Sequence, residues 1–224
     1  MKNKTNRELL SYLSTFLTDK RKALFEKVLQ YRSKHITVVL EDIYQPHNAS
    51  AVLRSCDLTG ILDVHIIENR NQYEVNPDVA LGSSKWLNLN TYNEHDNNTL
   101  STIQKLRQDG YKIIATTPHK NSQSLESIDL TEKIAVVFGT ELTGLSELAI
   151  ENADDYLRIP MYGFTESYNI SVSAALVLFT LTERMRKENV AWQLSETEHL
   201  QTLLEWTRRS INKVDAIEKR FLKK

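Results

Sequence analysis

The chain has 224 residues, of which 41% are apolar and 25% are charged, as in an ordinary globular protein. The longest nearly apolar run, 172–181, is too short to cross a bilayer, which takes about 20 residues, and the N-terminus has no hydrophobic signal segment. Cys56 is the only cysteine, which excludes an intrachain disulfide and a CxxC metal site. We therefore expect a cytoplasmic protein that needs neither a membrane nor a metal.

Charge is distributed unevenly along the chain, although the net charge is only −1. Residues 1–36 hold nine Lys/Arg against three Asp/Glu, and residues 184–224 hold ten against six. The middle of the chain, 37–183, holds nine against twenty. Two interpretations stay open at this point, which are solvated faces of basic helices and a polyanion gripped by the two ends.

Apolar residues at helical spacing predict two N-terminal helices, around 9–17 and 24–29, the second after a Thr18-Asp19 capping signal. From residue 35 onwards, short β-branched runs alternate with helical patterns. We expect strands at 35–41, 64–68, 86–92, 112–117, 133–139 and 155–161, and helices at 48–60, 98–110, 145–153, 169–188 and from Ser195, which forms a capping-box pattern with Glu198.

This alternation predicts an α/β fold with a mostly parallel sheet and helices on both faces. No linker, repeat or low-complexity segment interrupts the chain. We expect one central domain at 35–190, with basic helical extensions at 1–34 and 191–224.

The six glycines exclude the common nucleotide-binding motifs, because neither GxGxxG nor GxxxxGK[ST] occurs. Gly60 and Gly110 follow predicted helices and are explained as C-terminal caps. Gly139, Gly144 and Gly163 remain, in "VVFGTELTGL" and "IPMYGFTES", after the ends of predicted strands. Loops of this kind predict a ligand crevice at the carboxyl ends of the strands, although tight turns that need glycine are the alternative.

A second polar segment is "IYQPHNASAVLRSCDLTG", in which Asn48 or Ser50 is a candidate helix cap. Arg54 lies in a helix whose other residues are mostly apolar, so a buried arginine there needs a partner. That partner is either a carboxylate such as Glu141 or a substrate oxygen or phosphate. The six histidines show no metal-ligand spacing, and no GxSxG motif of a serine hydrolase occurs.

The three segments "NASAVLR", "FGTELTGL" and "IPMYGFTESYNISVSAAL", in this order, resemble the three motifs of the SPOUT class of RNA 2′-O-ribose methyltransferases. The resemblance covers about residues 37–190 and is nearest to the TrmH type, which methylates the ribose of guanosine 18 in tRNA. It implies S-adenosylmethionine as cofactor and a parallel sheet whose C-terminal part forms a deep trefoil knot. In such a knot, the polar loop 162–168 would be the knotted cofactor loop, between a strand and a helix that both belong to the core.

The resemblance also implies site residues. Backbone groups around Thr116, Gly139, Ile159, Met161 and Tyr168 would hold the cofactor, although the family usually has an aliphatic residue where Tyr168 stands. The catalytic residues implied are Arg54, Asn48, Glu141, Ser167 and Asn169. Because arginine stays protonated in proteins, we expect Arg54 to stabilise the developing alkoxide as a cation, rather than to take the proton itself.

The implied partners are tRNA and a second copy of the chain. RNA phosphates are expected to meet Lys20, Arg21, Lys22, Arg209, Lys213 and Arg220, the cations of the terminal extensions. The helix from Asn169 is apolar nearly all round, which indicates burial on every side and suits a homodimer. Two other functions stay open, which are methylation of ribosomal RNA or of another tRNA position, and RNA binding without catalysis.

Overall fold

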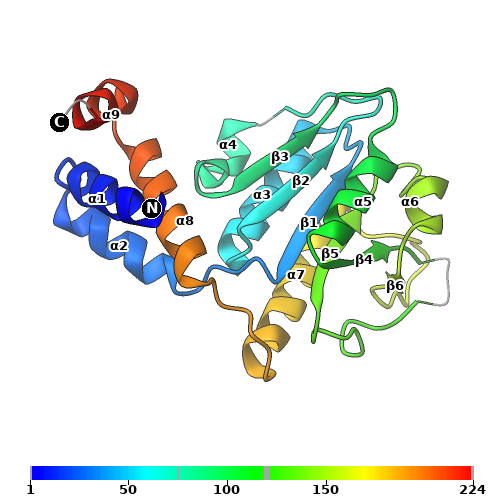
Figure 1. The fold of residues 1–224 in the computed structure, drawn as a ribbon. Helices are drawn as coiled ribbons and strands as arrows, with labels where there is room; N and C mark the ends of the chain where they lie inside the picture. The colour runs from blue at the N-terminus through cyan, green and yellow to red at the C-terminus, as the bar shows by residue number, and fades with distance from the viewer. Residues whose placement is uncertain (1, 75, 119–121, 223–224) are drawn as a thin grey trace. The chain divides into compact units, whose positions relative to one another are not determined.

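The computed structural model describes residues 2–74, 76–118 and 122–222. The chain divides into two compact units, Ser33–Trp192 and a second one formed by Met1–Arg32 with Gln193–Lys224. No helix among the described residues is long and apolar enough to cross a membrane. Figure 1 labels the elements of both units.

The larger unit is built on six parallel strands in the order β3-β2-β1-β5-β4-β6. The strands are β1 Ile36–Glu41, β2 Asp63–Ile67, β3 Asn88–Tyr92, β4 Tyr111–Thr116, β5 Lys133–Phe138 and β6 Asp155–Leu157. The predicted mostly parallel α/β sheet is therefore confirmed, with each of the six strands inside or near its expected segment.

Helices cover both faces of this sheet (Figure 1). One face packs against α3 (Pro46–Thr59) and α7 (Ile170–Lys187), and the opposite face packs against α5 (Thr99–Gln108) and α6 (Glu147–Glu151). Successive side chains of β1 alternate between the two cores, since Val38 and Leu40 join the first and Val39 joins the second. The short elements α4 (Pro77–Ala80) and η1 (Ser83–Trp86), which lie beside α3, were not predicted.

The expected ends of two elements were wrong. The strand predicted at 155–161 stops at Leu157, because Arg158 donates its backbone N–H to Gln123 O instead of to β4 and Pro160 has no N–H to donate. The helix predicted from Asn48 begins at Pro46, since proline suits the first turn of a helix. Consequently neither Asn48 nor Ser50 caps this helix; the Ser50 hydroxyl accepts the Asn76 N–H at 2.7 Å.

The smaller unit contains α1 (Lys2–Ser14), α2 (Asp19–Leu29), α8 (Glu196–Ser210) and α9 (Val214–Leu222). The caps predicted here are confirmed: Thr18 accepts the N–H of Arg21, and Ser195 forms a capping box with Glu198. Helices from both ends of the chain share one apolar core, in which Leu9 and Leu13 pack with Leu204. The sequence predicted one C-terminal helix, but Lys213, with φ of 57°, separates α8 from α9.

Candidate active site

The site lies where the direction of the strand order reverses. β1 and β5 are neighbours, yet the chain leaves β1 towards α3 on one face and leaves β5 towards α6 on the other. In a parallel sheet, the loops that diverge at such a point leave a crevice at the carboxyl ends of the strands. Asn48 follows β1 and Glu141 follows β5, so the two segments singled out in the sequence meet at this crevice.

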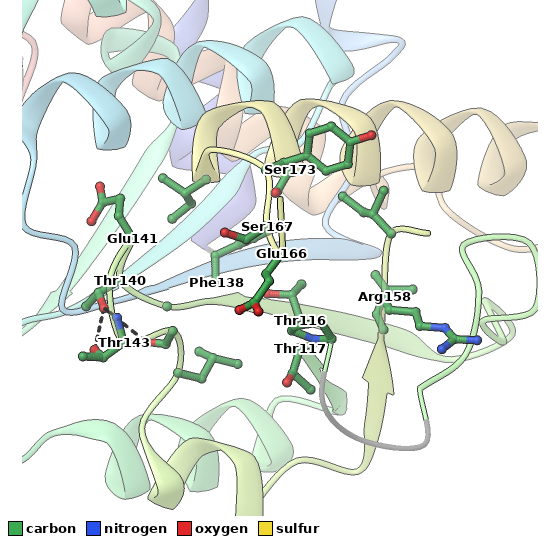
Figure 2. Close-up of a pocket in the computed structure, with 18 of the residues that line it drawn as sticks. Thr116, Thr117, Phe138, Thr140, Glu141, Thr143, Arg158, Glu166, Ser167 and Ser173 are labelled. Atoms are coloured by element: carbon green, nitrogen blue, oxygen red, sulfur yellow. Dashed lines mark hydrogen bonds between the residues drawn. The ribbon is translucent and has the colours of Figure 1, made fainter. Parts of the chain in front are cut away.

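A cavity of about 310 Å³ lies beside this crevice (Figure 2). Its lining comes from the ends of β4, β5 and β6 and the segments that follow them, from Ile150 of α6, and from the first turns of α7. All five residues predicted to hold a cofactor contribute to it, namely Thr116, Gly139, Ile159, Met161 and Tyr168. Two of the predicted catalytic residues, Glu141 and Ser167, line it as well.

The loop after β5 is a closed turn that requires glycine at its first position. Thr140 N donates to Gly144 O at 2.9 Å, and Gly144 N donates to Thr140 O at 3.1 Å. These bonds bring Gly144 so close that a Cβ on Gly139 would lie 2.2 Å from its carbonyl carbon. Gly144 itself has φ of 70°, in the left-handed region that favours glycine.

Sequence reasoning missed Glu41, the residue that anchors this loop. Glu41 ends β1 and is buried, with only 2% of its surface exposed. Its carboxylate accepts the Ser146 N–H at 2.9 Å, the Ser146 hydroxyl at 2.7 Å and the Thr99 hydroxyl at 2.7 Å. A buried carboxylate needs such donors, so an acidic residue at the end of an apolar strand was the available signal.

Asn48 connects the crevice to the other two motif segments. Its Nδ2 donates to Glu141 Oε1 at 2.6 Å and to Gln45 Oε1 at 3.2 Å, and its Oδ1 accepts Asn169 Nδ2 at 3.2 Å. Asn169 in turn caps α7, because its Oδ1 accepts the Ser171 N–H at 2.8 Å. Asn48 is buried, so these bonds fix the positions of Glu141 and Asn169 relative to α3.

Arg54 differs from the sequence expectation of a buried arginine. It lies on the exposed side of α3, whereas Val52, Leu53 and Cys56 face the core. Among the residues that the structure describes, its guanidinium has no hydrogen-bond or ion-pair partner, and the proposed structural partner Glu141 is bound by Asn48 instead. The guanidinium is therefore available to an oxyanion or a phosphate from outside the chain.

Two further charged residues of the cavity were absent from the sequence prediction. Glu166 precedes Ser167 on the loop to α7, and Arg158 follows β6. In Figure 2 the Glu166 side chain reaches across the cavity towards Thr116, whereas Arg158 extends away from Glu166. Both residues lie within or beside a motif, so the sequence showed where they stand in the chain but not where their side chains point.

Among the residues that the structure describes, no group of three or more His, Cys, Asp or Glu side chains is arranged so that it could hold a metal ion. Burial lowers the pKa of His65 to about 4, against a smaller opposing effect of Asp63. This ring stacks on Tyr92 and shares a 2.8 Å hydrogen bond with its hydroxyl, away from the cavity. His65 is therefore a neutral core residue.

The six predicted RNA-binding cations all belong to the helical unit. Lys20, Lys213 and Arg220 are exposed. The guanidinium of Arg21 lies 5.8 Å from the ring centre of Phe25, and Lys22 pairs with Asp19 at 2.9 Å. Arg209 is exposed on α8, and its neighbour Arg208 forms ion pairs with Glu205 and Glu218.

The chain is similar to known proteins over most of its length. A curated protein from Borreliella burgdorferi, named tRNA (guanosine(18)-2′-O)-methyltransferase, is 46% identical over 209 residues, or 93% of this chain and 94% of that protein. A protein of the same name from Thermus thermophilus is 35% identical and covers 72% of this chain and 81% of its own length.

Among solved structures, the tRNA-modifying enzyme TrmH/SpoU of Aquifex aeolicus has a TM-score of 0.77 and 29% identity, covering 87% of this chain and 98% of that one. The model of the SpoU rRNA Methylase family matches residues 35–179, which include β1, the whole cavity lining and most of α7. These residues are more than half of the chain. The chain therefore belongs to the SpoU rRNA Methylase family.

Proposed function

We propose that this enzyme is an S-adenosylmethionine-dependent tRNA (guanosine-18) 2′-O-methyltransferase. The observation that carries the proposal is the convergence of three separate segments, through Asn48, Glu141 and Asn169, beside one cavity. The choice of tRNA guanosine 18 rests on the relative from Borreliella burgdorferi, which bears this activity in its name and matches the chain almost from end to end. We also propose that the enzyme acts on tRNA in the cytoplasm.

The cavity fits S-adenosylmethionine in size and in chemistry. Its volume of about 310 Å³ lies within the usual range for ligand sites, roughly 300–1,000 Å³. Apolar side chains such as Ile159 and Met161 suit an adenine ring, and the carboxylate of Glu166 suits a ligand that carries positive charge. The bound cofactor would supply an electrophilic methyl group. The Thr116 hydroxyl donates a hydrogen bond to Val137 O at 2.8 Å, so Thr116 would bind the ligand through its backbone groups.

Arg54 acts on the ribose in this proposal. The 2′-hydroxyl must lose its proton as it is methylated, so negative charge develops on the oxygen. A guanidinium remains protonated throughout and stabilises that charge without giving up a proton. Arg54 is exposed and has no partner among the described residues, as a group that waits for substrate should be.

The remaining motif residues position the reacting groups. Asn48 holds Glu141 and Asn169, and Asn169 fixes the start of α7, next to the cofactor loop. Ser167 lines the cavity and is exposed, so its hydroxyl can bind cofactor or ribose. Holding both reactants in line accounts for much of the rate of such a displacement.

We further propose that the helical unit, 1–32 with 193–224, grips tRNA phosphates through Lys20, Lys213, Arg220 and neighbouring cations. The basic balance of both ends of the chain supports this role, because phosphate contacts give affinity without sequence selection.

The deep trefoil knot is also part of the proposal. The segment between β4 and β5 runs beside the exit of β6, where Gln123 N donates to Tyr156 O at 2.8 Å and Arg158 N donates to Gln123 O at 3.1 Å. Arg184 of α7 donates to Leu125 O at 2.6 Å and to Ile128 O at 2.9 Å on the same segment. Contacts on both sides of this segment support threading of the chain between β6 and α7 through the loop that the segment forms.

A homodimer completes the proposal. The sequence indicated that α7 is buried on every side, but within one chain its Val172, Leu176 and Phe179 are 44%, 41% and 64% exposed. These residues lie at i, i+4 and i+7, so they form one apolar stripe. A second copy of the chain is the partner that we propose for it, which would reconcile the apolar sequence with the exposure.

Methyl transfer from labelled S-adenosylmethionine to unmodified tRNA transcripts tests the function. We expect the wild-type enzyme to label a transcript with guanosine at position 18 and not a transcript with adenosine there. Arg54→Ala should lower kcat at least 100-fold, while cofactor affinity and thermal stability stay close to wild type, because the exposed guanidinium has no hydrogen-bond or ion-pair partner among the described residues. Arg54→Lys should recover only part of the rate, since a lysine lacks the fork-shaped guanidinium.

The outcomes separate the alternatives. Labelling of the adenosine transcript at another ribose would place the target elsewhere in tRNA. If no tRNA is labelled but S-adenosylmethionine binds, ribosomal RNA becomes the substrate to test. If Arg54→Ala keeps full activity, the proposed role of this residue is wrong.

A further inference from the structure

Of the described residues that line the cavity, three carry charge, namely Glu141, Glu166 and Arg158. The carboxylate of Glu141 is already engaged by Asn48 at 2.6 Å. The Arg158 side chain extends away from the other two (Figure 2). Glu166 is therefore the carboxylate of the cavity that no other group of the described residues engages.

Glu166 is placed for such a role. It lies on the loop from Met161 to Asn169, next to Ser167, and its side chain reaches over the cavity towards Thr116 (Figure 2). Within the described ranges, no hydrogen bond or ion pair of the protein uses its carboxylate. The negative charge is thus held at the cavity by the backbone of the loop and meets only solvent until a ligand enters.

S-adenosylmethionine and its product S-adenosylhomocysteine differ by a methyl group and by one positive charge. Both carry the same amino-acid ammonium and carboxylate, so any preference that arises from charge must come from the sulfonium. We propose that Glu166 is the counter-charge to this sulfonium, and that it makes the site favour the cofactor over the spent product. This inference rests on the proposed function, whose cofactor it takes as given.

The consequence is a site with lower affinity for the product than for the cofactor. Transfer of the methyl group to the ribose oxygen would convert the sulfonium to a neutral thioether, and Glu166 would then no longer attract the sulfur. Because Glu166 is exposed, solvent screens the interaction, so we expect a moderate preference and not an absolute one. The dissociation constants of the two ligands measure this preference without any methyl transfer.

Isothermal titration with three ligands tests the proposal. The ligands are S-adenosylmethionine, S-adenosylhomocysteine and sinefungin, an analogue in which a carbon that bears a protonated amino group replaces the methylated sulfur, so that it is also cationic. Glu166→Gln keeps the shape and removes the charge. We expect it to weaken S-adenosylmethionine and sinefungin about five- to twentyfold and S-adenosylhomocysteine less than twofold. The effect should shrink as salt is raised.

Glu151→Gln is the matched control, because Glu151 is an exposed carboxylate of the same unit that does not line the cavity. We expect it to change none of the three affinities. Equal weakening of all three ligands by Glu166→Gln would mean that the residue shapes the loop, and no change at all would mean that it does not face the sulfonium; either result overturns the inference. If the wild-type protein binds none of the ligands, the proposed function fails first.

Discussion

Gly139 shows how one residue determines the shape of the candidate site. A Cβ at this position would lie 2.2 to 2.3 Å from Gly144 and Leu145 backbone atoms, which cannot move without opening the turn. Gly163, also in a cavity loop, has no such constraint, because the nearest atom to an added Cβ would be 4.0 Å away. The two glycines therefore offer a matched comparison.

We expect Gly139→Ala to reduce the free energy of unfolding by about 1–3 kcal/mol and to weaken cofactor binding, because the turn is part of the cavity wall. Gly163→Ala should stay within about 0.5 kcal/mol of wild type. Urea unfolding and titration with S-adenosylmethionine measure both effects. A Gly139→Ala protein with unchanged stability and affinity would show that the turn is not needed in this form.

At the residue scale, the sequence predicted which residues belong to the site, but it did not predict their hydrogen bonds or their burial. The motif segments named Asn48, Glu141 and Asn169, but the bonds that join them depend on contacts 93 and 121 residues apart in sequence. Arg54 was expected to be buried because its neighbours are apolar. A helix has several faces, however, and the sequence alone does not say which of them is covered by α7.

At the scale of elements, regular periodicity predicted helices and strands well, and their ends depended on tertiary partners. The N-cap of α3 was misplaced because Asn48 and Ser50, both good capping residues, make tertiary bonds instead. β6 ends early because Gln123, from the loop after β4, takes its next hydrogen bond. Lys213 has a positive φ although residues other than glycine rarely adopt one, so the sequence did not indicate a break between α8 and α9.

The exposed stripe of α7 carries a prediction at this scale. Phe179 is 64% exposed in one chain, so Phe179→Glu should leave the folding of the single chain nearly unchanged. Placed in a dimer interface, the same charge should weaken association at least tenfold, because a buried carboxylate without a partner is costly. Leu58, which is 77% exposed on α3, provides the control Leu58→Glu.

Sedimentation equilibrium over a range of protein concentrations measures the association of both variants. We expect Phe179→Glu to shift the enzyme towards the monomer and Leu58→Glu to leave the wild-type distribution intact. A wild-type protein that is monomeric at micromolar concentration, or a dimer that survives Phe179→Glu, would argue against this face as the interface.

At the scale of the whole molecule, the division of charge follows the division into structural units. The basic ends of the chain fold together as one helical unit, although 160 residues of the sheet unit separate them in sequence. The alternation of strands and helices predicted the parallel sheet, because that pattern has few other solutions. The pairing of the two terminal segments has no local signature, since it arises from apolar contacts such as that of Leu13 with Leu204.

This arrangement predicts how tRNA binding depends on salt. The logarithm of the tRNA association constant falls linearly with the logarithm of salt concentration. Each phosphate contact that is lost should make this negative slope shallower by about 0.7–0.9. Replacing Lys20, Lys213 and Arg220 together by glutamine should therefore reduce the magnitude of the slope by about 2–3 and weaken binding at low salt, while cofactor affinity stays unchanged. These side chains are exposed and belong to the helical unit, so their loss should not affect the cavity of the sheet unit.

Lys133→Gln is the control, because this lysine lies at the amino end of β5, opposite the carboxyl edge that holds the site. Fluorescence anisotropy with labelled tRNA at several salt concentrations measures the slopes. If the triple variant keeps the wild-type slope, the helical unit does not grip phosphates through these cations. If Lys133→Gln lowers the slope as much as each helical cation does, binding reflects overall charge and not a defined surface.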